Sequence, residues 1–229
     1  MITINNNMYV LDTDNTSYVF AMLGSGQLEH LYYGRKLHAN EAVMTEKHTF
    51  IPGNTNVYNK DYSSYSLEDV CLEMSSLGKG DIREPFIEVT YPNGSSTTDM
   101  VFDRAEIIQG KEEYDTLPGS YDDNGDVEQL VIYLKDRNYN LTLELHYYVY
   151  EKCDIITRSA KLVNSGNESV RLERLMSMQL DLKESDYELS FFNGAWAREM
   201  NRSRIPIRAG KYVNESVTGT SSNRANPFL

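Results

Sequence analysis

Residue types suited to carbohydrate binding gather around the only tryptophan of the chain. The segment 191–199 reads Phe-Phe-Asn-Gly-Ala-Trp-Ala-Arg-Glu and contains Trp196 and Arg198. A tryptophan ring offers a broad apolar face that stacks on the C–H face of a sugar, and its N–H can reach a hydroxyl group. Gly194 lets the backbone approach another surface closely. The alternative is a tryptophan that fills the protein core, and the residue types alone favour this alternative slightly.

No set of residues stands out as catalytic. Glycoside hydrolysis needs two carboxyl groups, about 5–5.5 Å apart for retention or about 6.5–9.5 Å for inversion. The chain has 34 acidic residues, and no pair is distinguished by its spacing. The neighbouring pairs Glu112-Glu113 and Asp122-Asp123 are typical of solvated loops. The four histidines are scattered, and common hydrolase, metalloprotease and nucleotide-binding motifs are missing from the sequence. The residue types alone therefore single out no catalytic pair.

Composition limits the kinds of partner. The net charge of −12 disfavours nucleic acids and anionic membranes, because both require a basic surface. No run of apolar residues is long enough for a transmembrane helix, and the N-terminus does not resemble a secretory signal. The two cysteines, Cys71 and Cys153, lie outside any metal-binding spacing, so we expect free thiols, a reducing cytoplasm and neither metal nor cofactor.

The elements that must position these residues are predicted to be strands. The chain has 17 tyrosines, and Leu141–Tyr150 alternates apolar and polar residues, as a half-buried strand does. The segment Met176–Leu182 alternates in the same way and predicts another strand. Glycine and asparagine in three connections mark tight turns, among them a hairpin around Gly24-Ser25-Gly26. We expect about ten strands and two long loops, over 37–81 and 112–126.

Several motifs then resemble one family. In order along the chain they are Gly80-Asp81-Ile82-Arg83-Glu84-Pro85, Leu117-Pro118-Gly119, Tyr150 to Ser159 with its Ile155-Ile156-Thr157-Arg158-Ser159 ending, Gly194 to Glu199, and Thr220 to Phe228. Each motif is modest alone, but five in the right order are specific. They resemble the N-terminal region of glycoside hydrolase family 36, the bacterial α-galactosidases, over nearly the whole chain.

This resemblance implies a fold, and it implies that catalysis belongs to another part of a longer polypeptide. The fold is an all-β antiparallel β-supersandwich of two large packed sheets, with residues 1–229 as one N-terminal domain truncated before its last strands. The catalytic (β/α)₈ barrel of the family would follow in a longer polypeptide. The resemblance also implies sugar contacts from Trp196 and Arg198 at the pocket rim and from an acidic residue near Glu46. In the same loop the family pattern is Arg-x-(Phe/Tyr)-Ser-Leu. This chain reads Ser63-Ser64-Tyr65-Ser66-Leu67, so the arginine of the family is missing.

Three functions remain open at this point. The first is a non-catalytic, oligomerising domain of a bacterial cytoplasmic α-galactosidase, which acts on sugars such as melibiose and raffinose. The second is a stand-alone carbohydrate-binding module built around Trp196. The third is a mutarotase-like enzyme, which shares the supersandwich and needs a histidine and a carboxylate for acid–base chemistry. His146 is the only plausible histidine for that role.

Overall fold

The computed structural model describes residues 1–38, 56–114, 116–117, 119–182, 186–218 and 224–225. The chain divides into two compact units, Met1–Asp181 and Leu182–Leu229. Twelve strands and three short 3₁₀ helices, η1 (Lys60–Tyr62), η2 (Leu67–Asp69) and η3 (Glu151–Cys153), make up the regular structure of the described residues. None of these helices is long and apolar enough to cross a membrane.

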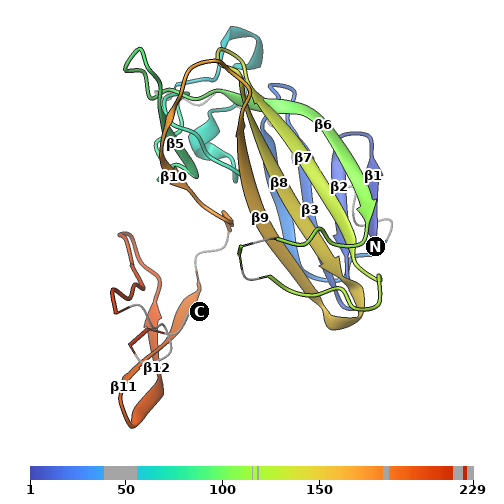
Figure 1. Cartoon of the computed structure of the whole chain (residues 1–229), viewed down its shortest axis with the longest axis vertical. Coiled ribbons are helices and arrows are strands. Elements are labelled where there is room, and N and C mark those ends of the chain that lie inside the picture. Colours follow the sequence, from blue (N-terminus) through green and yellow to red (C-terminus); the bar gives the residue numbers. More distant parts are fainter. Residues whose placement is uncertain (39–55, 115, 118, 183–185, 219–223, 226–229) are drawn as a thin grey trace. The chain divides into compact units, whose positions relative to one another are not determined.

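Two antiparallel sheets of four strands each form the body of the first unit. The first sheet contains β1 (Ile2–Asn5), β2 (Met8–Asp12), β3 (Thr16–Met22) and β4 (Leu28–Arg35). The second sheet contains β6 (Met100–Gln109), β7 (Glu128–Asp136), β8 (Leu141–Tyr150) and β9 (Ile155–Asn164). In both sheets neighbouring strands follow the order of the chain. Figure 1 shows the second sheet, in green to gold, lying across the blue strands of the first.

The core lies between these two sheets and follows the period-two pattern of the strands. Leu143, Leu145 and Tyr147 of β8 point inward and are almost fully buried. The Tyr147 ring stacks on Phe20 of the first sheet with 5.1 Å between ring centroids. Because the alternate residues of β8 point to the opposite face, the strand predicted over Leu141–Tyr150 is confirmed. The all-β sandwich is confirmed as well.

The turn predicted at Gly24-Ser25-Gly26 is also confirmed, since it joins β3 to β4 in an antiparallel hairpin. Gly26 adopts a φ of +97°, which a side chain would strain. A Cβ atom there would also lie 3.1 Å from the Cβ of Val101 on β6. Glycine is therefore required both by the backbone conformation and by the close approach of the second sheet.

The strand predicted over Met176–Leu182 is wrong. β10 (Arg171–Leu175) ends before it, paired with β5 (Ile87–Thr90), and the residues that follow have no strand pairing. Their polar side chains bond to a neighbouring backbone instead. Gln179 accepts from the Ser75 N–H at 2.9 Å, and Asp181 accepts from the Leu72 N–H at 3.1 Å. The polar residues of this segment alternate with apolar ones because they form side-chain hydrogen bonds, and not because the segment belongs to a β ladder.

One carboxylate joins the two sheets at the end of the sandwich. Asp154 lies in the turn between β8 and β9 with a left-handed φ of +54°. Its Oδ1 accepts hydrogen bonds from the Thr13 hydroxyl at 2.8 Å and the Asn15 N–H at 2.7 Å. Its Oδ2 accepts from the Asn15 side-chain amide at 2.7 Å. These bonds lower the Asp154 pKa, and they tie the β8–β9 turn to the β2–β3 turn.

Candidate functional site

The tryptophan segment forms the tip of a hairpin in the second unit. β11 (Glu188–Ala195) pairs antiparallel with β12 (Arg198–Pro206), and Trp196 and Ala197 form the turn between them. Ala197 has a φ of +58°, the kind of backbone conformation that tight hairpin turns favour. Trp196 is 86% exposed, so the alternative of a tryptophan in the core of this chain is wrong. Arg198 is exposed beside it.

Short-range contacts fix the shape of this tip. The register of the hairpin shifts between Asn193 and Ala195, which brings Gly194 against the opposite strand. A Cβ atom on Gly194 would lie 2.9 Å from the Cα of Glu199. The Ala197 N–H donates to the Glu199 carboxylate at 2.9 Å. These contacts fix the tip in a conformation that presents an indole face and a guanidinium group to solvent.

We expect Gly194→Ala to open the hairpin tip, because the added methyl group meets backbone that cannot move aside. Overpacking of this kind costs about 1–3 kcal/mol. Hydrogen exchange of the β11 and β12 amides should become faster, and the emission of Trp196 should change, since it is the only tryptophan. Ala197→Gly is the matched control, because glycine suits the positive φ at that position. Unchanged exchange in Gly194→Ala would contradict this account.

A second group of polar side chains is buried in the sandwich. Glu73 is fully buried and accepts hydrogen bonds from the Tyr18 hydroxyl at 2.6 Å and the Tyr147 hydroxyl at 2.8 Å. His30 Nδ1 lies 2.9 Å from the same carboxylate, and Arg158 pairs with it at 3.1 Å. The five side chains come from both sheets and from the segment after β4, so the cluster joins three parts of the first unit.

Electrostatics favour the charged form of this cluster. Burial raises the pKa of Glu73, but Arg158 and the hydrogen bonds from His30 and Tyr18 outweigh it and hold the pKa below its usual range. Burial raises the pKa of Tyr147 well above its ordinary value, so its hydroxyl stays protonated and donates. Four donors thus occupy one carboxylate. We interpret the cluster as a structural one that holds the two sheets together.

Arg83 organises a third group, at the end of the loop that precedes β5. Its Nε donates to Asp81 at 2.9 Å, and it forms an ion pair with Asp181. Its remaining N–H groups donate to the carbonyl oxygens of Val70 at 2.7 Å and Leu67 at 2.5 Å. One guanidinium group therefore holds together segments that are far apart in the sequence.

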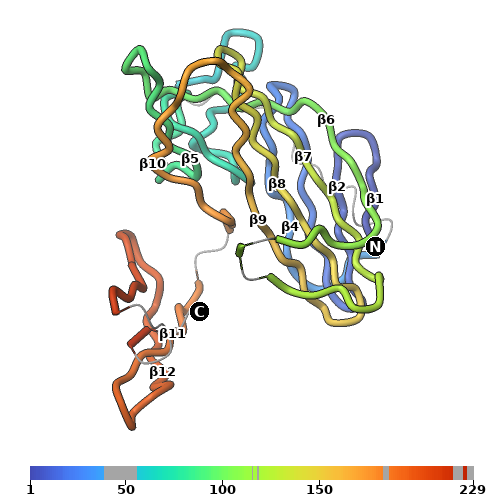
Figure 2. Tube along the Cα trace, in the orientation of Figure 1, coloured from blue at the N-terminus to red at the C-terminus, as the bar shows by residue number. Residues whose placement is uncertain are grey.

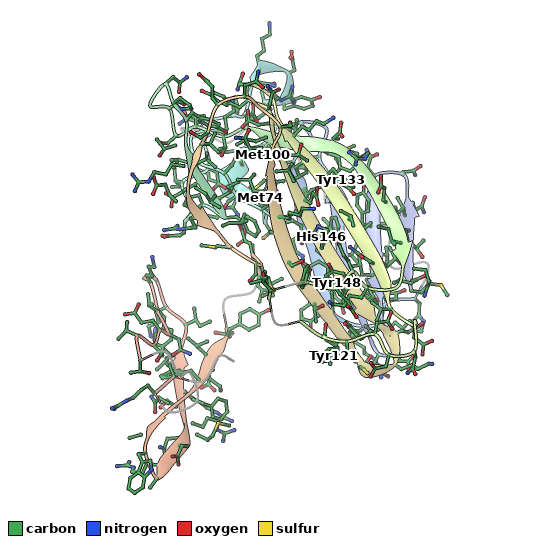
Figure 3. All side chains as sticks on the ribbon, in the orientation of Figure 1. Met74, Met100, Tyr121, Tyr133, His146 and Tyr148 are labelled. Atoms are coloured by element: carbon green, nitrogen blue, oxygen red, sulfur yellow. The ribbon has the colours of Figure 1, made fainter. Side chains whose placement is uncertain are left out.

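His146 lies on the outer face of β8, with Tyr148 on the same strand (Figure 3). Its Nε2 is 3.2 Å from Glu144, and its Nδ1 is 2.9 Å from the side-chain amide of Gln129. Burial lowers the pKa of His146, although Glu144 opposes this effect. The histidine singled out for acid–base chemistry therefore does lie beside a carboxylate, but both of its ring nitrogens are already engaged.

Comparison with known proteins assigns the family. A family model described as "Glycosyl hydrolase family 36 N-terminal domain" matches residues 26–229. The chain belongs to glycosyl hydrolase family 36. It is 35% identical over 225 residues to Alpha-galactosidase AgaA of Geobacillus stearothermophilus, covering 96% of this chain and 30% of that protein. The family 36 resemblance drawn from the sequence motifs is thereby confirmed.

Solved structures of family 36 enzymes agree with this assignment. The α-galactosidase AgaB of Geobacillus stearothermophilus superposes with a TM-score of 0.92 at 31% identity, covering 99% of this chain and 31% of that chain. The α-galactosidase of Lactobacillus brevis gives 0.88 at 34% identity, covering 98% and 31%. The chain thus spans about 30% of the length of its relatives. It corresponds to their non-catalytic N-terminal domain.

The structure gives two of the family 36 motifs a structural role. Arg83 clamps a loop, and Arg158 pairs with the buried Glu73. Glu46, the predicted sugar-binding carboxylate, lies outside the described residues. In the part of the same loop that follows, Tyr65 and Leu67 are buried in a small apolar cluster. The sugar contacts of Trp196, Arg198 and Glu46 therefore stay predictions.

Proposed function

We propose that this chain is the N-terminal domain of a family 36 α-galactosidase that hydrolyses terminal α-galactosides such as melibiose and raffinose. In this proposal the catalytic carboxylates lie in the part of the polypeptide that the relatives carry beyond the matched region. This domain shapes the rim of the active site and supplies oligomer contacts. The proposal is supported by relatives of this kind, because variants of AgaA have been crystallised in complex with raffinose and with stachyose.

The observation that carries the proposal is the presentation of Trp196. An indole ring that is 86% exposed on a fixed hairpin tip is unfavourable in the isolated domain, because its apolar surface is in contact with water. Such a position is useful where the ring meets a partner with both apolar and polar faces, and a sugar is such a partner. Arg198 next to it can donate several hydrogen bonds to sugar hydroxyls. We assign both residues, together with Glu46, to the outer part of the sugar pocket.

The test is Trp196→Ala in the longer enzyme that the proposal implies. Loss of one stacking contact, worth about 0.5–1.5 kcal/mol, should raise KM for raffinose by about twofold to tenfold and leave kcat nearly unchanged. A small aryl α-galactoside should be affected less, since it does not extend to the rim. Tyr121→Ala is the matched control, because Tyr121 is 81% exposed but belongs to the first unit. Equal kinetics of both variants on raffinose would rule out the assignment of Trp196.

A stand-alone carbohydrate-binding module is the competing function, and the exposed Trp196 is compatible with it as well. Calorimetric titration of residues 1–229 with galactose, melibiose and raffinose separates the two. We expect no heat of binding, because a rim residue supplies only part of a pocket and does not offset the entropy cost of binding alone. Binding that disappears in Trp196→Ala would support the module. Release of galactose from an aryl galactoside by residues 1–229 would refute the non-catalytic role.

We also propose a cytoplasmic location and self-association for this protein. Cys71 and Cys153 form no disulfide bond in the structure, which fits a reducing compartment. The acidic surface that accompanies a net charge of −12 disfavours binding to nucleic acids and anionic membranes. The partners that we propose are α-galactosides and further copies of the protein.

A further inference from the structure

Asparagine followed by glycine occurs three times in the chain, at Asn93-Gly94, Asn124-Gly125 and Asn193-Gly194. This pair is reactive, because glycine has no side chain to keep its backbone nitrogen away from the asparagine amide carbon. The glycine nitrogen loses its proton and forms a bond to Cγ, and ammonia leaves. Water then opens the cyclic imide to aspartate or isoaspartate. The three sites share this chemistry, so their surroundings decide which of them reacts in the folded protein.

Two structural conditions govern the closure of the imide ring. The asparagine side chain must swing toward the backbone, so hydrogen bonds made by its amide oppose the reaction. The glycine nitrogen must approach Cγ, so a hydrogen bond from its N–H opposes the reaction, and so does a β ladder that fixes the backbone. A site held by such bonds reacts only after the structure opens locally.

Asn93 lies in the connection between β5 and β6, and both ends of its side-chain amide are engaged. Its Oδ1 accepts from the Ser95 N–H at 3.0 Å, and its Nδ2 donates to the Tyr139 hydroxyl at 3.1 Å. The Gly94 N–H donates to the carbonyl oxygen of Tyr91 at 2.9 Å. The Tyr139 ring stacks on Tyr91, which fixes the acceptor in place. Neither condition for ring closure is met at Asn93.

Asn193 is held by its backbone. It lies within β11 and pairs with Asn201 of β12 on one side. On the other side it forms an antiparallel bridge with Ala225, and the Gly194 N–H donates to the carbonyl oxygen of Arg224 at 3.2 Å. The strand therefore has a partner along both edges at this point. Ring closure at Asn193 must first break this pairing.

Asn124 lies in the connection between β6 and β7, which Figure 2 shows in green, and its side chain is exposed. Among the described residues this side chain forms no hydrogen bond or ion pair. The Gly125 N–H donates to the carbonyl oxygen of Asp122 at 3.4 Å, beyond the usual range of about 2.7–3.2 Å. A Cβ atom placed on Gly125 would meet nothing within 4 Å, so the space around the attacking nitrogen is open. Both conditions for ring closure are met at Asn124.

We propose that Asn124 is the asparagine–glycine site at which the folded chain deamidates. The reaction consumes one water molecule, releases one ammonia molecule and requires neither an enzyme nor a cofactor. It adds one negative charge to a chain whose net charge is −12. Asn93 and Asn193 react at least about tenfold more slowly, because several hydrogen bonds must break before either ring can close.

The isoaspartate product changes the turn around it. The Asp122 carboxylate accepts from the Asp126 N–H at 3.0 Å, and the Gln109 side chain donates to the carbonyl oxygen of Gly125 at 2.9 Å. Lys152 pairs with Asp126 at 2.9 Å. Isoaspartate routes the backbone through its side-chain carbon, and this extra atom displaces the next residues from their partners. Amide exchange in the turn should become faster, whereas the free energy of unfolding should change little, because the turn lies outside the core.

Incubation of residues 1–229 in mild alkali, followed by tryptic digestion and mass spectrometry, tests the proposal. The three sites fall in different tryptic peptides, 84–104, 112–135 and 184–198. The 112–135 peptide should show the mass of a deamidated residue first. Its rate should rise by up to about tenfold per pH unit, since the attacking nitrogen must lose a proton. Asn124→Gln is the matched control, because it keeps the amide group but lengthens the side chain and so disfavours ring closure.

Two further measurements show whether the fold sets the order of reaction. In concentrated urea the three peptides should react at similar rates, because the bonds that hold Asn93 and Asn193 are lost. Tyr139→Phe removes the acceptor of the Asn93 amide but keeps the ring that stacks on Tyr91. Asn93 should then react about twofold to tenfold faster, and Asn124 at its wild-type rate.

Several outcomes overturn the proposal. One is a folded chain in which Asn93 or Asn193 reacts as fast as Asn124. Another is a set of rate ratios that is the same in urea as in the folded protein. A Tyr139→Phe variant that leaves the rate at Asn93 unchanged also overturns it, because the hydrogen bonds would then not control the reaction. None of these outcomes bears on the role of Trp196, which is tested separately.

Discussion

Replacing Glu73 by glutamine is expected to lower the free energy of unfolding by about 3–5 kcal/mol, because it leaves a buried arginine charge without its partner. Arg158 and Glu73 have side chains that are 5% and 0% exposed. The Tyr18 and Tyr147 hydroxyls lose a charged acceptor in the same change. Urea unfolding followed by circular dichroism measures the loss.

A double-mutant cycle distinguishes this cause from simple loss of packing. Arg158→Met should also be strongly destabilising, since it leaves the Glu73 charge buried and unpaired. The double variant Glu73→Gln/Arg158→Met removes both charges, so its cost should be clearly smaller than the sum of the two single costs. Additive costs would show that the ion pair does not couple the two residues.

The cluster around Glu73 also leads to a prediction of how stability depends on pH. The pKa of Glu73 is lower in the folded protein than in the unfolded chain, where it is about 4.3. A lowered pKa stabilises the folded state above the unfolded pKa, and this contribution is lost as the pH falls through the folded pKa. The difference in stability between the wild type and Glu73→Gln should therefore be full at neutral pH and shrink in acid. A difference that grows in acid would contradict the assigned direction.

Arg83→Met is the second substitution with a large expected effect, about 2–4 kcal/mol. Methionine keeps part of the apolar stem but leaves the Asp81 and Asp181 carboxylates without their cation. The carbonyl oxygens of Leu67 and Val70 lose a donor as well. Hydrogen exchange should become faster both in residues 67–75 and in residues 176–181, because the clamp joins these segments.

Arg174→Met is the matched control for Arg83→Met. Arg174 also pairs with two carboxylates, Glu84 at 2.6 Å and Glu88 at 3.2 Å. These three side chains are between 30% and 47% exposed, so the loss should stay below about 1 kcal/mol. Arg83→Lys should fall between the wild type and Arg83→Met, since an ammonium group cannot reach all four acceptors. Equal losses at Arg83 and Arg174 would argue against a clamp.

The fold was predictable wherever one face of a strand is buried. In β8 the inward and outward residues differ in polarity, so the period of two is visible in the sequence. The same signal misled over 176–182, because Gln179 and Asp181 alternate with apolar residues for a different reason. Their side chains replace a neighbouring strand as hydrogen-bond partners of residues 72–75. The pattern of polar and apolar residues shows which side chains are buried, but it does not show which groups form hydrogen bonds with the backbone.

The candidate site was predictable only in part. Trp196 drew attention as the only tryptophan, and its position in a hairpin tip depends on Gly194, which the sequence also displays. The pairing of His30 with Glu73 gave no local signal, because 43 residues separate them and both lie in unremarkable surroundings. The family motif around Arg158 pointed to the same cluster without naming its partners. Long-range pairs of this kind come from sheet topology rather than from local patterns.

The bonds between Asp154 and Asn15 have a consequence for producing this protein. Asn15-Thr16-Ser17 is an acceptor sequence for N-linked glycans, and the Asn15 amide nitrogen is the atom to which a glycan attaches. In the folded protein that nitrogen donates to Asp154. A eukaryotic secretory host would place a bulky oligosaccharide where two turns meet, before the turns have closed. A bacterial cytosolic host leaves the amide bare.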